Sequence, residues 1–438
     1  MHPIARVIAR VKPRDWTAII LGLIWLFLLL GLDIEPKAFQ DNYFAKSKAP
    51  WWDGSLYLAG KPFGLYFFYK LAGHDPVWVI RLQCVLAAFS WTLLACILAA
   101  PIKRDIVAVF VIAAISLGAL SWNIAGWHFC YLSESVTAST FAVFYGAFLW
   151  FWRQPNWRRF AFLLSTALYL GVLREQMPFF LLSFAGLAWL IAFFQRHFHR
   201  QRYLYASGLL VFSISLLGLT SWTSNRAQRH VVPFYNVLLK RILANPAHAA
   251  WFEKQGLPLS LLDDDPFDWE GKWASDHDMA LFRNRDNWPM HEWVIKKGRL
   301  GLAHFLITHP GYVWQSAWDQ RGDIFNGDVT DYTRPPPRTF PFTLARWLWT
   351  PWPLWLLGPL FAGYLWLIIK KNAPPWPLVL AICAVLTGLL SFHADAMEVA
   401  RHCAFTGWAL QTAAWHGLIL VMGNLIRLRD KEMTTQTE

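Results

Sequence analysis

Residues 16–32 read WTAIILGLIWLFLLLGL, an apolar stretch that follows the cations Arg6, Arg10, Lys12 and Arg14. A helix of roughly 20 apolar residues crosses the ~30 Å hydrocarbon core of a bilayer, so this stretch is close to spanning length. It lacks the small-residue cleavage site of a secretory signal and runs directly into an acidic loop. We therefore expect it to remain as a membrane anchor.

Stretches of this kind recur along the chain. Its 438 residues are 56% hydrophobic and 16% charged, and 28 of them are Trp, which is more apolar surface than a soluble core hides. Irregular backbone facing lipid would leave polar groups unpaired, so the spans should be helices. We predict an all-α polytopic membrane protein with about ten transmembrane helices, at 16–32, 77–100, 106–121, 136–152, 160–173, 177–194, 203–222, 347–369, 376–392 and 404–425.

Basic residues decide the predicted orientation. With the amino terminus inside, the segments on that face hold 17 of the 40 Lys and Arg but only 5 of the 28 Asp and Glu. This is the positive-inside pattern, and it assigns the whole formal charge of +12 to one face. We expect a multi-pass protein of a bacterial inner membrane, with both termini cytoplasmic. The charge indicates contact with anionic membrane lipids, and we expect no nucleic-acid partner.

Polar segments on the other face suggest the domain organisation. The first external loop, 33–75, is acidic and amphipathic, and 122–135 should be a short external turn. Segment 223–343 is too long for a linker, with helical pattern at 236–255 and 288–318. We expect a seven-helix bundle with its loop (1–222), a mainly helical external subdomain (223–343), and three last membrane helices with a cytoplasmic tail (344–438).

Ionisable residues at the outer ends of these helices are the candidates for a site, because charge there is costly and usually serves a purpose. The first loop supplies Asp33, Asp41, Asp53 and Lys61, and it also holds the pair Trp51 and Trp52. The later segments supply Glu134, Arg174, Glu175, Asp395, Glu398, Arg401 and His402.

Several of these residues also have a purely structural interpretation. Glu134 suits the start of a helix through capping and the helix dipole. Arg174 and Glu175 form either a structural ion pair or part of a site. If 395–402 is helical, Asp395 and the charged residues after it share one face.

Metal and cysteine chemistry has little support in the sequence. His393 and Asp395 leave a divalent metal as an open alternative, although no third ligand is evident. The five cysteines lie in or beside apolar spans without metal-ligand spacing and should be packing residues. The cofactor therefore stays undefined.

At this point several motifs together resemble the GT-C superfamily of membrane glycosyltransferases, which includes the enzymes that use dolichyl-phosphate mannose. The first external loop carries DNY at 41–43 and GKPFG at 60–64. Later motifs are similar to those of bacterial members: YLSES at 131–135, LREQ at 173–176, HPGY at 309–312 and HADAMEVARH at 393–402.

The resemblance implies transfer of a sugar from a polyprenyl-phosphate donor to a glycan, lipid or protein acceptor on the periplasmic face. It places the catalytic carboxylate in the first external loop, where Asp41 beside Tyr43 matches best. Asn42 stands where many relatives have Ser, so Asp33 and Asp53 remain rivals for the role of base.

The chemistry of such a transfer assigns the other candidates. A lipid phosphate that leaves needs positive charge, and Arg174 and Arg401 offer guanidinium groups suited to it, with Lys61 and His402 as further donors. Trp51 and Trp52, beside the acids, are candidates either to stack on sugar rings or to lie in the lipid headgroup layer. Three alternatives stay open: a polysaccharide polymerase or ligase that uses lipid diphosphates, a lipid or sugar transporter, whose charges should lie near the membrane midplane, and a non-catalytic scaffold, which tolerance of a replacement at Asp41 would favour.

Overall fold

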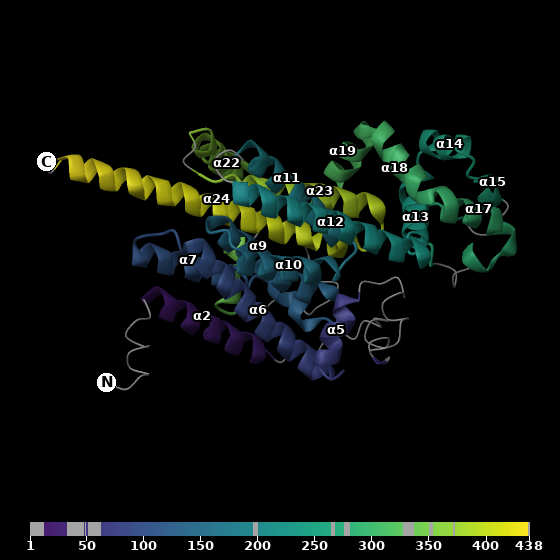
Figure 1. Cartoon of the computed structure of the whole chain (residues 1–438). Helices are drawn as coiled ribbons and strands as arrows, with labels where there is room; N and C mark the ends of the chain where they lie inside the picture. Colours follow the sequence, from purple (N-terminus) through teal and green to yellow (C-terminus); the bar gives the residue numbers. More distant parts are fainter. Residues whose placement is uncertain are drawn as a thin grey trace.

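The chain folds into helices packed side by side (Figure 1). The computed structural model describes residues 13–32, 48, 50, 63–195, 200–263, 268–275, 281–326, 337–349, 354–370 and 373–436. These ranges contain α-helices, short 3₁₀- and π-helices and no strand, which confirms the predicted all-α class.

Six of the described helices are long and apolar enough to cross a membrane, as expected for a multi-pass membrane protein. A seventh crossing results if the bent pair Asp105–Gly118 and Trp122–Phe129 is one span. The count of ten stays a prediction. The six are α6 (Pro76–Ala99), α9 (Ser133–Arg153), α11 (Met177–Phe194), α12 (Arg200–Arg226), α23 (Trp376–Ala394) and α24 (Val399–Gln436), of which Val399–Leu428 is the apolar part.

Helix α9 lies at the centre of the bundle. Within its apolar window 89% of the residues are buried, against 22% for α12. It packs against α6, α24 and α10 (Trp157–Gly171). Its rings Phe141, Phe144 and Phe148 are fully buried and meet rings of α11 and α24 edge to face. Edge-to-face packing of this kind holds neighbouring helices in fixed positions.

The other bundle helices extend the bundle beyond α9. α2 (Pro13–Leu30) and α7 (Asp105–Gly118) pack against α6 and each other, and α22 (Leu354–Ile369) packs against α24. α5 (Gly64–Leu71) shares a small apolar core with Val79 of α6 and Val136 of α9. The predicted span 347–369 is split between α21 (Phe342–Trp349) and α22. Residues 350–353, between these two helices, lie outside the described residues.

The prediction of a short external turn at 122–135 is wrong. Segment 122–135 forms α8 (Trp122–Ala125), the 3₁₀ turn η1 (Gly126–Phe129) and the start of α9, and its side chains are buried inside the bundle. Trp127 meets the ring of Trp408 from α24, whose indole N–H donates to the carbonyl of Asn123 at 2.8 Å. The aromatic side chains of this segment pack in the core of the bundle, which explains why the segment is buried.

A second group of helices packs around its own apolar core at one end of the bundle (Figure 1). Phe234, Phe252, Trp293 and Phe305 belong to this core, and so does Ala396 from the turn between α23 and α24. The group comprises α13 (Val231–Val237), η2 (Leu238–Ile242), α14 (Pro246–Lys254), α15 (Ser260–Asp263), η3 (Arg285–Asn287), α17 (Trp288–Trp293), η4 (Val294–Gly298), α18 (Arg299–Thr308) and α19 (Pro310–Asp319). The next helix, α20 (Arg321–Asn326), packs instead against α24 and α23 of the bundle.

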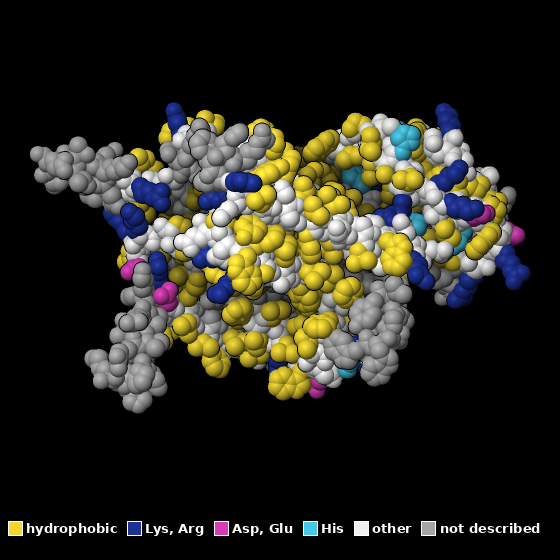
Figure 2. All heavy atoms as spheres, viewed as in Figure 1, with side chains coloured by type: hydrophobic (Ala, Val, Ile, Leu, Met, Phe, Trp, Pro, Cys, Tyr) yellow, Lys and Arg dark blue, Asp and Glu magenta, His cyan; other side chains and the backbone are white. Residues whose placement is uncertain are grey.

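Apolar and basic side chains occupy different parts of the molecular surface. Figure 2 shows apolar side chains across the middle of the visible face, whereas Lys and Arg gather toward the two ends. Large apolar side chains such as Phe27, Val211 and Phe110 are exposed on the bundle helices. A soluble protein rarely exposes so large an apolar surface, so this band is where lipid would contact the protein.

Candidate functional site

The carboxylate of Glu134 is the centre of the candidate site. Glu134 is the second residue of α9, and its side chain has no solvent exposure. Its Oε1 atom lies 3.1 Å from a terminal nitrogen of Arg174 and 2.8 Å from Nε of Arg401. Arg401 in turn contacts Glu398 at 2.6 Å. We call Glu134, Arg174, Arg401 and Glu398 the Glu134 cluster.

Three separate parts of the chain build this cluster. Glu134 comes from the start of α9, Arg174 from the turn between α10 and α11, and Arg401 from the first turn of α24. Arg174 also donates to the carbonyl of Arg401 at 3.5 Å, and Gln176 donates to the carbonyl of His402 at 2.8 Å. The α10–α11 turn is thus tied to α24 by both side chains and backbone.

The capping interpretation of Glu134 is wrong. The residue before α9, Leu132, makes no side-chain cap, and the Glu134 carboxylate is directed to the two arginines. Ser133 donates to the other carboxylate oxygen at 3.4 Å. A buried carboxylate is tolerated only when cations and hydrogen bonds compensate for its lost hydration, and these groups do so.

Of the two alternatives for Arg174 and Glu175, the ion pair with each other is not formed. Arg174 is 6% exposed and faces Glu134, whereas Glu175 is 48% exposed and contacts Arg229. Desolvation raises the pKa of Glu175, and the charges of Arg229 and Arg174 oppose that rise. Glu175 is therefore a solvent-accessible carboxyl group whose affinity for protons is increased by the protein around it.

Asp395 lies at the junction between the bundle and the second helix group. Its Oδ1 accepts from the amide of Asn236 at 3.3 Å and from the backbone N–H of Met397 at 2.9 Å. Desolvation raises the pKa of Asp395 and Glu398 adds to the rise, while the two hydrogen bonds and Arg241 oppose it.

The predicted helical face at 395–402 is wrong in its first half. α23 ends at Ala394 and α24 begins at Val399, so Asp395 and Glu398 lie in the turn between them. Glu398 has a φ of 51°, in the left-handed region that side chains rarely adopt. This backbone conformation brings Glu398 within reach of Arg401, so the cluster forms by a tight turn instead of a helix face. His402 lies next to Arg401 with its ring near Arg174.

The first loop returns to the bundle beside this cluster. Asp33, Asp41, Trp51, Trp52, Asp53 and Lys61 lie outside the described residues. The last glycine of the GKPFG motif, Gly64, is described: its N–H donates to the carbonyl of Val172 at 2.9 Å, and its carbonyl accepts from Tyr169 at 3.4 Å. Val172 lies two residues before Arg174, so the end of the loop is anchored on the same turn.

Metal-binding groups are not evident near the cluster. Among the residues that the structure describes, no group of three His, Cys, Asp or Glu is arranged to hold a metal ion. His393 instead points Nε2 at the carbonyl of Val313, at 3.2 Å. The five cysteines are free and buried or half-buried, as expected for packing residues.

Three polar residues of the site were missed in the sequence: Arg229, Asn236 and Arg241. Arg229 contacts Glu175, Asn236 donates to Asp395, and Arg241 donates to the carbonyl of Phe392 at 2.5 Å. All three belong to the start of the segment after α12. Polar residues near a predicted helix end were a weak signal for them, because that segment contains many other charges.

Known proteins provide no further guide to this arrangement. No protein-family profile matches the chain, and a search of curated proteins finds no relative.

Proposed function

We propose that the chain is an integral-membrane glycosyltransferase of the GT-C type, which transfers a sugar from a polyprenyl-phosphate donor to a glycan, lipid or protein acceptor. The observation that carries the proposal is the Glu134 cluster beside the anchored end of the first loop. Charged groups converge there at one end of helices of spanning length. A lipid-carried substrate needs its polar group at that depth and its chain among the helices.

The proposed orientation places this end at the periplasmic face of a bacterial inner membrane. The proposal includes ten membrane helices with both termini in the cytoplasm. Positive-inside charge supports this orientation. The location of the cluster at helix ends also favours surface chemistry over transport, because a transporter holds its substrate near the midplane.

The first loop supplies the proposed general base. Asp41 takes the proton of the acceptor hydroxyl, the hydroxyl oxygen forms the new glycosidic bond, and the bond from the sugar to the lipid phosphate breaks with its electrons on the phosphate. A single displacement of this kind inverts the anomeric carbon. Asp33 and Asp53 are the rival bases, and Glu175 and Asp395 are described carboxyl groups with a raised pKa.

Arginines of the site stabilise the leaving phosphate in this proposal. Arg401 is 18% exposed and Arg229 is 19% exposed, so each has an edge open to a ligand. Arg174 is nearly buried against Glu134 and acts as a positioning residue that holds Arg401 and the α10–α11 turn in place. Guanidinium groups bind phosphate oxygens through paired hydrogen bonds. Lys61, Trp51 and Trp52 of the first loop, together with His402 and Asp395, complete the set of substrate-binding residues in this proposal.

The experiment measures sugar transfer in membranes that contain equal amounts of each variant, with radiolabelled polyprenyl-phosphate sugars as donors. Asp41→Asn should lower the rate by about 10²–10⁴-fold, the usual contribution of a general base. Asp53→Asn should lower it much less. Asp105→Asn serves as the matched control, because Asp105 is an exposed acid at the start of α7, at the other end of the bundle.

The outcomes separate the alternatives. Full activity of Asp41→Asn would defeat its assignment as base. If the wild type transfers from no polyprenyl-phosphate sugar but extends glycans from lipid diphosphates, the protein is a polymerase or ligase. Uptake or flipping of a lipid-linked sugar without bond formation would identify a transporter.

A further inference from the structure

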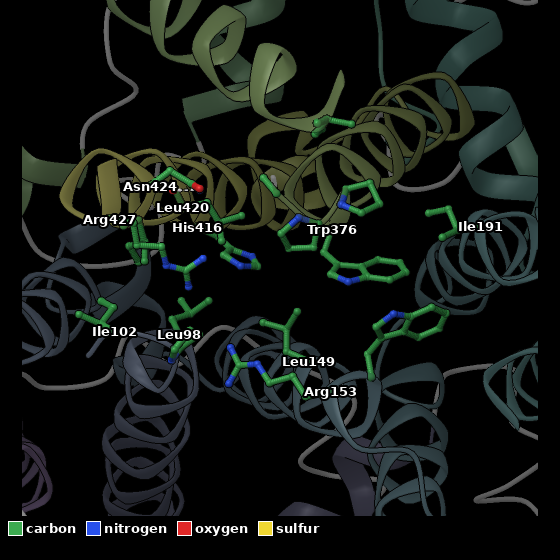
Figure 3. Close-up of a pocket in the computed structure, with 18 of the residues that line it drawn as sticks. Leu98, Ile102, Leu149, Arg153, Ile191, Trp376, His416, Leu420, Asn424 and Arg427 are labelled. Atoms are coloured by element: carbon green, nitrogen blue, oxygen red, sulfur yellow. Dashed lines mark hydrogen bonds between the residues drawn. The ribbon is translucent and has the colours of Figure 1, made fainter. Parts of the chain in front are cut away.

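A cavity in the bundle lies at the end remote from the Glu134 cluster. It has a volume of about 1050 Å³ and is lined by the last turns of α6, α9 and α11, the start of α12 and α23, and α24 (Figure 3). Glu134 and the cavity residue Arg153 occupy opposite ends of the 21-residue helix α9, about 30 Å apart at 1.5 Å per residue. The cavity is therefore a separate site.

Cations dominate the polar part of the cavity wall. Five of the described lining residues are Lys or Arg and none is Asp or Glu: Lys103, Arg104, Arg153, Arg202 and Arg427. Figure 3 shows Arg153 on α9 and Arg427 on α24 extending toward the space from opposite walls. Neither forms an ion pair within the part of the chain that the structure describes. An anion that binds between Arg153 and Arg427 would reduce the repulsion between their like charges.

The remaining wall is apolar and aromatic. The rings of Trp152 and Trp376 meet with centroids 4.4 Å apart, and Arg202 lies over the Trp152 ring at 5.8 Å. Leu149 and Leu420 continue this surface beside the cations. An inorganic anion would gain nothing from such a wall, whereas an acyl chain would be buried against it.

Orientation rules alone do not account for this arrangement. Positive-inside charge requires cations near one end of the helices, and Arg158 and Arg200 meet that need outside the cavity. Arg153 and Arg427 are exposed as well, but they differ in lining the cavity. The cavity adds convergence of cations on a hollow that also has apolar walls. Its volume exceeds what a phosphate ion fills and suits a headgroup with part of a chain.

We propose that this cavity binds an anionic phospholipid, with the phosphate of the headgroup between Arg153 and Arg427 and an acyl chain against Leu149, Leu420 and the paired tryptophans. Basic pockets between membrane helices recognise anionic headgroups through the same combination of charge and apolar contact. The site is independent of the proposed sugar transfer. Lipid binding in the cavity therefore stands or fails separately from the reaction proposed at the other end.

The test measures lipid affinity of the purified full-length protein by native mass spectrometry. Phosphatidylglycerol and phosphatidylcholine are added separately after delipidation, and inorganic phosphate is tested by its effect on thermal stability. We expect at least about 10-fold tighter binding of phosphatidylglycerol, because each cation near an anionic headgroup contributes roughly fivefold. The double variant Arg153→Gln, Arg427→Gln should lose about 30-fold in affinity for phosphatidylglycerol on the same basis.

Two further variants keep the test decisive. Arg158→Gln with Arg200→Gln removes the same charge from exposed positions at the same end, and its affinity should stay within about twofold of wild type. Leu420→Trp fills part of the apolar wall without a change of charge and should weaken phosphatidylglycerol binding. All variants are first required to elute as single species in size exclusion.

Three results would overturn the proposal. One is equal affinity for both lipids, which would mean that the cations do not select an anion. Another is an equal loss in the two double variants, which would show a diffuse charge effect and no cavity site. The third is stabilisation by inorganic phosphate that depends on Arg153 and Arg427 while Leu420→Trp leaves lipid binding unchanged, which would identify a soluble phosphate compound as the ligand.

Discussion

The residue that organises the candidate site is Glu134, because a single carboxylate oxygen receives two guanidinium groups. Arg174 and Arg401 both approach Oε1, and neither the acid nor Arg174 has an appreciable exposed surface. Removal of one member of a buried charged set leaves the others without compensation for their lost hydration. Replacement of Glu134 therefore tests the stability of the protein as well as its function.

Replacement of Glu134 by Ala should destabilise the protein by about 3–5 kcal/mol, because it leaves Arg174 buried without its anion. The matched control is Glu292→Ala, which removes an ion pair between the exposed side chains of Glu292 and Lys296 and should cost at most about 1 kcal/mol. Thermal denaturation in detergent measures the stability of both variants, with the loss of the monodisperse size-exclusion peak as the readout. Equal stability of the two variants would contradict the buried position of the cluster.

Asp395 allows a prediction that depends on pH. Because its folded pKa is raised, burial favours the protonated acid, so the wild type loses stability as the pH rises through that pKa. Asn at this position still accepts from Asn236 and Met397 and carries no charge. Asp395→Asn should therefore gain melting temperature relative to wild type between pH 4 and pH 8. A difference that is constant across this range would mean that Asp395 is not desolvated.

At the scale of elements, the α10–α11 turn connects the first loop to the cluster. α5 begins at Gly64, whose N–H bonds to this turn, and a Cβ atom added there would lie 2.8 Å from the carbonyl oxygen of Val172. Real Cβ atoms do not approach a backbone oxygen so closely. The glycine of the GKPFG motif is thus required by a close backbone contact next to Arg174.

Gly64→Ala should destabilise this contact by roughly 1–3 kcal/mol, since the backbone on one side must move. Gly186 on α11 is the matched control, because an added Cβ there meets nothing within 4 Å. Gly186→Ala should be neutral or stabilise the helix by up to about 1 kcal/mol. The readout is proteolysis of the first loop together with melting temperature, and an unchanged Gly64→Ala protein would disprove the anchoring role.

On the scale of the whole molecule, the bundle presents two chemically different ends. One end carries the Glu134 cluster and the second helix group, and the other carries the basic cavity. In a membrane these ends face different compartments, because the helices between them are of spanning length. Orientation therefore decides which chemistry each site has access to.

Labelling of introduced cysteines tests the orientation. Arg158→Cys and Arg200→Cys lie at the basic end, and Lys254→Cys and Lys297→Cys are exposed in the second helix group. A membrane-impermeant maleimide should modify the second pair in intact spheroplasts and the first pair only after permeabilisation. Native cysteines are buried or half-buried, so the unmodified protein supplies the background. Labelling of both pairs from the same side would refute a spanning bundle.

The sequence by itself determined the class of protein and most of its helices. Apolar stretches of spanning length, with cations at alternate ends, predict a helical membrane protein without any knowledge of packing. Local chemistry also fixed several helix starts. Asp75 accepts from two backbone N–H groups at the start of α6 with Pro76 as the first residue, and Asn156 and Asn245 cap α10 and α14. Such interactions lie within a few residues and are readable from the chain.

Only the tertiary structure decided which charges meet. The sequence grouped Glu134, Arg174, Glu175 and Arg401 at one boundary. It left open whether Arg174 and Glu175 form an ion pair or part of a site, and the helix pattern favoured a cap at Glu134. Glu134 instead pairs with Arg401, which is 267 residues away. The choice depends on how α9 packs against α24 and on the turn that holds Glu398. Long-range pairing of this kind follows from the close packing of helices, which no local pattern encodes.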